Sequence, residues 1–459
     1  MITLFRSDTI CPLSQINEQM ANHIKQLPAK VSSIGDCPTI LRYEFRCGPI
    51  DILTWLHNQR TNTKIYWSDR KESFEMGGVG IAAGVKGGGS INTKEIFEYM
   101  EDRLSADNPR LRYYGGMNFD HSFCDEQWQE FGTYQFIVPQ FELYRIKKLT
   151  TFAFNIAINE IKPENIETIL TTLQQLDFST QTTYRKAPQV CSRADLPNKE
   201  EWGAIFKKVG ENADHQKVVL ARKSVFKFDV AIRPDALLKH LKDQSPGCYH
   251  FCFQFSTNSA FLGATPERLY KRAQRTIKSE AIAGTRPRGT DDAQDQEYEN
   301  QLLNSPKDLK EHQYVVDTIN TALTPLCTAL RSENQFSLRK LEGSQHLVTS
   351  FEGELKEKVY DQDILDSLHP TPAVAGCPTD TALQTIRELE PFDRGWYAGP
   401  VGYVGFHQTE FAVAIRSGLV QGDQLSLYAG AGIVAGSTAQ DEWDEIENKI
   451  SNFIKVFKK

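Results

Sequence analysis

Four features are missing from this 459-residue sequence, and each absence argues against a class of protein. The formal net charge is −7 and no block of Lys and Arg stands out, which argues against nucleic acid or an anionic membrane as partner. No apolar run approaches the roughly 20 residues of a membrane-spanning helix. The first residues lack a basic stretch followed by an apolar one, so we expect no signal peptide. The nine cysteines form no Cys-x-x-Cys pair, which favours reduced thiols and a cytoplasmic location.

The chain otherwise has the composition of a globular protein, 40% hydrophobic and 24% charged. Its N-terminal half alternates short strand-like runs with glycine-containing turns, which predicts an antiparallel sheet. Within that half, the glycine-rich stretch 78–89 fits neither phosphate-loop spacing, so we interpret it as a β-hairpin. The polar segment Ser179–Leu196 shows no clear pattern and is predicted to be a surface linker.

The C-terminal half is more regular, and its elements can be predicted individually. Lys217–Arg222 is predicted to form a strand. A helix is predicted to begin at Pro306, with Ser305 as its N-cap and an acid, Asp308, three residues after the cap, and to run toward Leu323. The last helix has apolar residues at three- and four-residue steps, which predicts a face packed on the core: Trp443, Ile446, Ile450, Phe453, Ile454 and Phe457.

The first candidates for chemistry are acids in apolar, glycine-containing surroundings: Glu267, Glu280, Glu311 and Glu445. Such carboxylates suit a buried Mg²⁺ and a general acid. Two of them have a plainer interpretation, because Glu311 could be the solvated partner of a helix N-terminus and Glu445 could pair with Lys449 on the helix surface. Lys217 opens an apolar strand, from whose end it could simply extend toward solvent.

Two further features favour a site for an anionic ligand. The strand-like run before the last helix contains Gly430 and Gly432, where the backbone can approach a ligand closely. Arg416 is predicted to lie on a strand, on the same face as Glu410 and Ala414. An arginine between apolar neighbours either pairs with a buried acid or binds a ligand carboxylate.

Six motifs, taken in their order and spacing, resemble those of the chorismate-utilising enzymes: GATPERL, EAIAGTRPRG, KDLKEH, QHLVTSFEGEL, HPTPAVAG and YAGAGIV…EWDEIENK. This family includes anthranilate, aminodeoxychorismate, salicylate and isochorismate synthases. The resemblance is strong over about 203–455 and weaker before it. It implies an α+β fold of stacked β-sheets surrounded by helices, with the site in a central cleft. It also implies one chorismate-binding-type domain over 1–459, in which 1–195 is less typical and 200–455 carries the motifs.

The resemblance also implies roles for individual residues. Mg²⁺ would be held by Glu311 and Glu445. Lys217 would activate water as a base, and Glu267 would protonate the departing 4-hydroxyl of chorismate. The other implied residues contact the carboxylates or the ring of the substrate: Gly284, His346, Ala373, Tyr397, Arg416, Gly432 and Lys449. A buried histidine is also a common core residue, so no proton transfer is assigned to His346.

Three positions separate the members of the family. Ammonia-using members carry Gln where this chain has Lys217, anthranilate synthases usually carry Thr at the position of Ala373, and aminodeoxychorismate synthases carry Lys at that of Ala283. The resemblance thus implies isochorismate formation from chorismate, for menaquinone or siderophore synthesis, without a glutaminase. Salicylate synthases share the Lys and Glu pair and are the alternative; a non-catalytic homologue that binds chorismate or a partner protein is a third hypothesis. We expect a monomer or weak homodimer.

Overall fold

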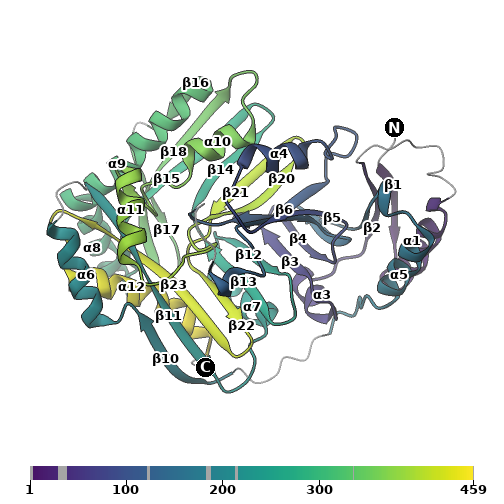
Figure 1. The fold of residues 1–459 in the computed structure, drawn as a ribbon, viewed down its shortest axis with the longest axis horizontal. Coiled ribbons are helices and arrows are strands. Elements are labelled where there is room, and N and C mark those ends of the chain that lie inside the picture. The colour runs from purple at the N-terminus through teal and green to yellow at the C-terminus, as the bar shows by residue number, and fades with distance from the viewer. Residues whose placement is uncertain are drawn as a thin grey trace.

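The computed structural model describes residues 4–28, 39–120, 125–181, 188–211, 216–333 and 335–457. These residues form two large β-sheets with helices packed outside them, which confirms the predicted α+β class (Figure 1). Aromatic side chains pack between the sheets. Trp67 of the first sheet lies 6.2 Å from Tyr403 of the second, measured between ring centroids, and Trp396 lies 5.7 Å from Phe253.

Thirteen described strands make the first sheet, and Figure 1 shows it running from the N-terminal end of the molecule to the C-terminal helices. In spatial order its main path is β1 (Leu4–Cys11), β2 (Ile40–Cys47), β9 (Leu149–Ala157), β8 (Phe141–Ile146), β4 (Phe74–Val79), β3 (Lys64–Ser68), β12 (Tyr249–Gln254), β13 (Ser259–Thr265), β22 (Ser417–Gln421), β23 (Gln424–Val434), β11 (Lys217–Phe228) and β10 (Val190–Leu196), with β19 (Gly376–Cys377) beside β11.

Ten described strands make the second sheet. Its main path is β16 (Cys327–Ser332), β18 (Ser344–Leu355), β15 (Thr276–Pro287), β14 (Arg268–Ala273), β21 (Gln408–Val413), β20 (Pro400–Gly405), β6 (Arg112–Met117), β7 (Tyr134–Val138) and β5 (Ala83–Gly87), with β17 (Ser337–Lys340) beside β18. Both sheets join the two halves of the chain, because β3 pairs with β12 and β6 pairs with β20.

Helices cover the outer faces of the sheets and gather at both ends of the molecule (Figure 1). At the N-terminal end α1 packs on α5, and at the other end α9 packs on β15 and α12 on β23. The α-helices are α1 (Ile16–Lys25), α3 (Ile52–Asn58), α4 (Thr93–Glu101), α5 (Pro163–Gln174), α6 (Lys199–Glu211), α7 (Pro234–Gln244), α8 (Asp292–Leu303), α9 (Pro306–Leu323), α10 (Asp361–Leu368), α11 (Thr379–Leu389) and α12 (Ala439–Ile454).

The predicted helices of the C-terminal half are confirmed. Helix α9 begins at Pro306, and the Ser305 hydroxyl accepts a hydrogen bond from the Asp308 N–H, as an N-cap does. The apolar stripe of α12 is buried from Trp443 to Ile454. Strand β11 begins at Lys217 as predicted but continues to Phe228, where it still pairs with β10.

Two predictions in the N-terminal half are wrong. The supposed linker contains β10, which pairs with β11, because a strand at a sheet edge can be polar on both faces; 182–187 of that segment lie outside the described residues. The supposed hairpin at 78–89 is the point where the chain leaves one sheet for the other. Strand β4 pairs with β3 and β8, whereas β5 pairs with β7 of the second sheet.

The chain also crosses between the sheets at two places that matter for the site. It passes from β13 to β14 through Pro266 and Glu267, and from β21 to β22 through Ala414, Ile415 and Arg416. The two crossings lie side by side, since the Val413 N–H donates to the Glu267 carbonyl over 3.1 Å. The prediction that Arg416 lies on a strand with Glu410 is therefore wrong: β21 ends at Val413, and Arg416 has a left-handed φ of +50°.

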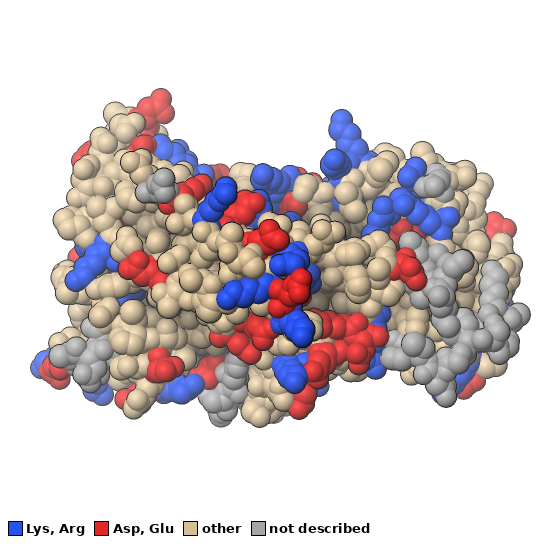
Figure 2. Space-filling model, turned by 90° about the horizontal axis from the view of Figure 1, so that it is seen from above, with Lys and Arg blue, Asp and Glu red and all other residues tan. Residues whose placement is uncertain are grey.

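The surface has a mixed charge pattern. On the face shown in Figure 2, Lys and Arg side chains lie among Asp and Glu, and acidic side chains gather near one edge. The described part of this face is thus unlike the continuous basic face of a nucleic-acid-binding protein. None of the helices described combines the length and the apolar character needed to cross a bilayer.

Candidate active site

A cavity lies where the two sheet crossings, β15, β23 and α12 meet. Of the eleven residues to which the resemblance assigns a role, ten line it: Glu267, Gly284, Glu311, His346, Ala373, Tyr397, Arg416, Gly432, Glu445 and Lys449. The eleventh, Lys217, lies directly behind Glu311. A larger depression of about 680 Å³ shares Thr285, Arg416, Glu445 and Lys449 with the cavity, and so forms its approach from the surface.

Glu267 is a buried acid, only 4% exposed, on the crossing between β13 and β14. No hydrogen bond or ion pair joins its carboxyl to another described residue. Burial raises the pKa of Glu267 to about 8, and the charge of Glu280 adds to the effect, while Lys217 opposes it. A carboxyl in this position keeps its proton near neutral pH and can deliver it to a bound molecule.

Buried Lys217 and partly exposed Glu311 form an ion pair. Lys217 is the first residue of β11, held between Val434 of β23 and Cys377 of β19. Its Nζ lies 3.0 Å from Glu311 Oε1 on α9, and its side chain is 1% exposed. This is the one polar contact of Nζ within the described part of the chain, although an ammonium has three N–H donors. The remaining donors are free to meet a water molecule or a ligand.

Glu445 and Lys449 lie one turn apart on α12 and are in contact. Lys449 Nζ donates to Glu445 Oε1 over 2.7 Å and to the Gly430 carbonyl over 2.8 Å. Burial opposes ionisation, but the Lys449 ammonium keeps the pKa of Glu445 below its usual value. Glu445 is therefore an anion on the cavity wall, beside a lysine whose position is fixed at two points.

The two glutamates fit a metal ion that keeps part of its water shell. Glu311 and Glu445 line one cavity, and each is balanced by a single lysine. Among the described residues, no three His, Cys, Asp or Glu side chains gather as an all-protein metal site requires. Mg²⁺ is typically bound through one or two carboxylates, with water and substrate oxygens filling the other positions. The donors present thus suit Mg²⁺ rather than Zn²⁺.

A chain of hydrogen bonds fixes Arg416 and defines the state of His346. Arg416 Nη2 lies 2.7 Å from His346 Nε2 and donates to the Ser344 hydroxyl over 2.8 Å. Because a guanidinium only donates, Nε2 must be the acceptor, and Nδ1–H then donates to the Thr285 hydroxyl over 3.0 Å. Burial and the Arg416 charge hold the pKa of His346 well below its usual value, so the ring is neutral.

The remaining predicted residues shape the wall. The Tyr397 ring stacks on Tyr428 at 5.3 Å between centroids. Gly284 forms a bulge in β15, at a φ of +74° that favours glycine, and so shifts the register next to Thr285. Gly432 leaves room for the ion pair of Lys217 with Glu311, since a Cβ there would lie 2.9 Å from Glu311 Oε1 and 3.1 Å from Lys217 Cε. Ala373 lines the wall without a polar atom.

Sequence reasoning misplaced one acid and missed several polar residues. Glu280 does not line the cavity; it is enclosed by three arginines, and these hold its pKa at about 2 despite burial. Thr285 and Ser344, which bond to His346, were missed, although both belong to or adjoin the quoted motifs. Arg70 was missed as well, because it comes from a distant part of the chain and belongs to no motif.

Comparison with known proteins identifies the family and the fold. The family model described as chorismate binding enzyme matches residues 24–458. The chain is 37% identical over 418 residues to the chloroplastic isochorismate synthase of Catharanthus roseus, covering 88% of this chain and 71% of that protein. It is 33% identical to the isochorismate synthase MenF of Bacillus subtilis, covering 89% and 90%. The solved structure of the menaquinone-specific isochorismate synthase MenF of Escherichia coli matches with a TM-score of 0.85 at 27% identity, covering 97% of this chain and 99% of that one.

Proposed function

Because the chain belongs to the family of chorismate-binding enzymes, we propose that it converts chorismate to isochorismate. One observation carries the choice among the reactions of this family. A buried lysine directly behind the cavity wall, Lys217, and a buried acid on that wall that holds its proton, Glu267, lie at one site. Water is a weak nucleophile and needs a base, and a departing hydroxide needs an acid.

The two residues divide the chemistry between them. Lys217, an ammonium in its pair with Glu311, must first release one proton to solvent; the neutral amine then takes a proton from water as the water oxygen forms a bond to C2 of the ring. The ring double bond shifts, the C4–O bond breaks, and Glu267 supplies the proton with which the 4-hydroxyl leaves as water. Lys217 then holds the proton taken from the nucleophile, and Glu267 is left as a carboxylate. The reverse sequence of transfers regenerates chorismate, so the reaction is reversible.

Two groups of residues would hold the two carboxylates of the substrate. Glu311 and Glu445 would hold Mg²⁺, which when bound supplies a Lewis acid for the ring carboxylate. Lys449 and the backbone at Gly284 contribute to the same pocket. Arg416 would bind the enolpyruvyl carboxylate, together with Tyr397 and the backbone at Gly432. His346 supports this arrangement as a neutral acceptor that fixes the guanidinium.

The test of the proposal is the product formed from chorismate and Mg²⁺ by the purified protein, without glutamine or ammonia. Isochorismate is the expected product, separated by chromatography and identified by its mass spectrum and retention time. A lactate-dehydrogenase assay run in parallel should detect no pyruvate above the uncatalysed background. Pyruvate in amounts equal to fluorescent salicylate would make the protein a salicylate synthase, and an amino product formed with ammonium would contradict the role of water.

Removal of the metal gives a further prediction. EDTA should abolish turnover and Mg²⁺ should restore it, because Glu311 and Glu445 would bind the ring carboxylate of the substrate only through a divalent cation. Glu311→Gln and Glu445→Gln should each raise the Mg²⁺ concentration for half-maximal activity by tenfold or more, because an amide is a much poorer Mg²⁺ ligand. Glu388→Gln, which removes an exposed carboxylate from α11, is the matched control. Full activity in metal-free buffer would contradict the assignment.

Gly432 offers a test of the ion pair that needs no change of charge. The Cβ of Gly432→Ala would lie 2.9 Å from Glu311 Oε1 and 3.1 Å from Lys217 Cε and so push both side chains slightly aside. We expect kcat to fall severalfold, about tenfold at most, since misplacement of reacting groups by about 1 Å can cost 10²-fold. Gly203→Ala in α6, where a Cβ meets nothing within 4 Å, is the control for the substitution itself. Unchanged kinetics of Gly432→Ala would show that the position of the pair is not critical.

We further propose that the isochorismate feeds menaquinone synthesis. Two similar proteins named above, from Bacillus subtilis and Escherichia coli, carry the name MenF, and the second is described as menaquinone-specific. A strain that lacks this protein should lose menaquinone and regain it when supplied with the intact gene. Loss of a catechol siderophore with normal menaquinone would assign the protein to the other branch.

A further inference from the structure

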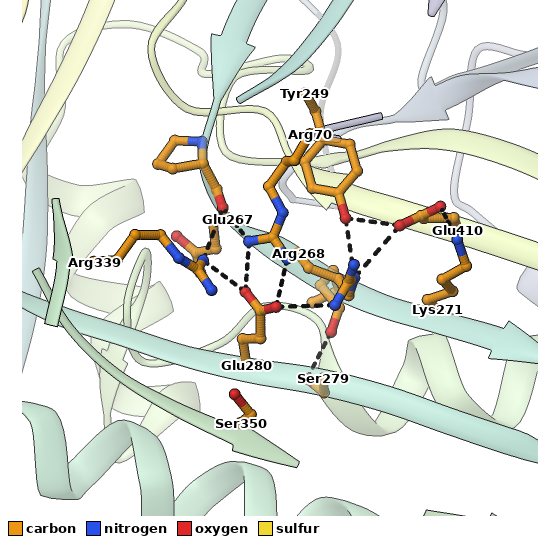
Figure 3. Close-up of polar contacts among 12 residues, drawn as sticks. Arg70, Tyr249, Glu267, Arg268, Lys271, Ser279, Glu280, Arg339, Ser350 and Glu410 are labelled. Atoms are coloured by element: carbon orange, nitrogen blue, oxygen red, sulfur yellow. Dashed lines mark hydrogen bonds and ion pairs between the residues drawn. The ribbon is translucent and has the colours of Figure 1, made fainter. Parts of the chain in front are cut away.

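Three arginines converge on Glu280 next to the crossing that carries Glu267 (Figure 3). Arg70 binds both carboxylate oxygens of Glu280, while Arg339 and Arg268 bind one oxygen each, over 2.8 and 2.9 Å. We call Arg70, Arg268, Glu280 and Arg339 the Glu280 cluster. The three arginine charges more than balance the single carboxylate charge of Glu280, and all four side chains are between 5% and 25% exposed.

Two members of the cluster also bind the backbone just before Glu267. Arg70 Nη1 donates to the Pro266 carbonyl over 3.0 Å, and Arg339 Nη1 donates to the same oxygen over 3.4 Å. The Pro266 carbonyl belongs to the peptide whose nitrogen is that of Glu267. Its position therefore helps to set where the Glu267 side chain starts, together with the Val413 N–H, which donates to the Glu267 carbonyl, and the Thr265 hydroxyl, which accepts from the Glu267 N–H over 3.3 Å.

The cluster joins four separate elements around this one peptide. Arg70 follows β3, Arg268 begins β14, Glu280 lies in β15 and Arg339 in β17. Arg70 is also fixed from behind, since its guanidinium lies 5.1 Å from the centre of the Tyr249 ring. A bidentate arginine–carboxylate pair is rigid in a way that a single ion pair is not.

We propose that Arg70 is a positioning residue for Glu267, acting through the Pro266 carbonyl from a platform formed by Glu280 and Arg339. The inference rests on the proposed function, in which Glu267 is the acid. It assigns a part in the reaction to a residue of the N-terminal part of the chain, which lies outside the motifs. No other described contact fixes the Glu267 carboxyl itself, so the placement of its backbone is what determines where its proton is delivered.

The Arg70→Ala variant tests this by separating kcat from KM. Because Arg70 does not line the cavity, KM for chorismate should stay within about twofold, while kcat should fall about tenfold or more, as expected for a misplaced reacting group. Arg70→Lys keeps the charge but only one donating nitrogen and should recover part of kcat, and guanidinium ion added to Arg70→Ala should recover kcat further. Arg275→Ala is the matched control, because it removes a half-exposed arginine outside the Glu280 cluster that likewise binds a backbone carbonyl, that of Leu355, and two surface glutamates.

The pH profile supplies a readout that a merely structural role would not move. The charged groups around Glu267 are Lys217 on β11, Glu280 on β15, Arg416 on the second crossing and Lys449 on α12. Removing Arg70 leaves the negative charge of Glu280 less neutralised, which should raise the pKa of Glu267. The loss of kcat at high pH should therefore occur at a higher pH than in the wild type. Glu280→Gln removes the negative charge and should shift it to lower pH.

Several results would overturn the inference. They are unchanged kcat in a folded Arg70→Ala, a rise in KM at constant kcat, or an unmoved pH profile. If Arg70→Ala does not fold, Arg339→Met decides instead, because Arg339 is more exposed and shares the same carbonyl; normal kcat in that variant would then contradict the role of the platform. Failure of the wild type to form isochorismate would instead refute the proposed function, so the two failures are distinguishable.

Discussion

Lys217→Ala is expected to lose at least about 10²-fold in kcat while KM for chorismate changes little. General acid–base groups typically contribute about 10²–10⁴-fold, and the substrate carboxylates would be held by other residues, chiefly Arg416 and Lys449. Lys217 is buried behind Glu311 rather than on the cavity wall, so its removal should affect the activation of water more than the binding of substrate. Steady-state kinetics at saturating Mg²⁺ measure both parameters.

Two controls separate this effect from a general disturbance of β11. Lys227→Ala removes an exposed lysine near the other end of the same strand, outside the cavity lining, and should leave kcat unchanged. Lys217→Gln keeps a polar side chain at this position but not the base. With that variant, high ammonium should allow ammonia to replace water at C2 and give an amino product. Near-normal kcat in Lys217→Ala would remove the main support for isochorismate formation.

Arg416→Ala should show the opposite kinetic pattern. Its guanidinium is aimed by Ser344 and His346 and lines the cavity, so its loss should raise KM by tenfold or more through lost carboxylate binding. An effect on kcat alone would place Arg416 with the reacting groups instead. The contrast between Lys217→Ala and Arg416→Ala thus tests the division of the site into a reacting pair and a binding frame.

What could be predicted from the sequence depended on whether the signal was local. The N-cap of α9 and the apolar stripe of α12 are encoded within a few residues, and both were correct. The stretch 78–89 has the glycines of a turn, but no local pattern states that β4 and β5 belong to different sheets. Arg416 failed for the same reason: alternation continues past Val413, and only the crossing to β22 ends the strand.

The site shows the same limit. The sequence was enough to name the site residues that come from β11, β15, α9 and α12, because the family resemblance identifies them together. Arg70 could not be named in this way, since its contact with Glu280 joins residues 210 positions apart and depends on β3 pairing with β12. The burial of Glu267 is equally invisible in the sequence, where Glu followed by Arg268 indicates an exposed pair. Arg268 in fact turns away to Glu280 and Tyr249.

Glu267→Gln is expected to lose about 10²–10⁴-fold in kcat with KM little changed, because an amide cannot give a full proton to the leaving hydroxyl. The wild type should show the matching pH dependence. The carboxyl donates only while protonated, and burial raises its pKa to about 8, so kcat should fall as pH rises through about 8. A profile flat to pH 9.5 would contradict the role of Glu267 as acid.

The same substitution should stabilise the protein at high pH. The pKa of Glu267 is higher in the folded state than in the unfolded state, so folding loses stability as pH rises from about 4 to about 8, by about 1.4 kcal/mol for each unit of difference. Glu267→Gln removes that cost. Its Tm should exceed that of the wild type at pH 8.5, and the difference should shrink toward zero near pH 4.

Glu280→Gln is the matched control, and its effect should have the opposite sign. The arginines around Glu280 hold its pKa at about 2, so its ionised form stabilises the fold above about pH 4, and that contribution is lost as pH falls through about 2. Glu280→Gln leaves three arginines without their shared acid and should lower Tm at pH 8.5. A catalytic acid with a raised pKa lowers the stability of the fold at high pH, whereas an acid whose ionised form is held by arginines raises that stability. If Glu267→Gln lowered Tm at pH 8.5 as Glu280→Gln does, Glu267 would belong to the second kind.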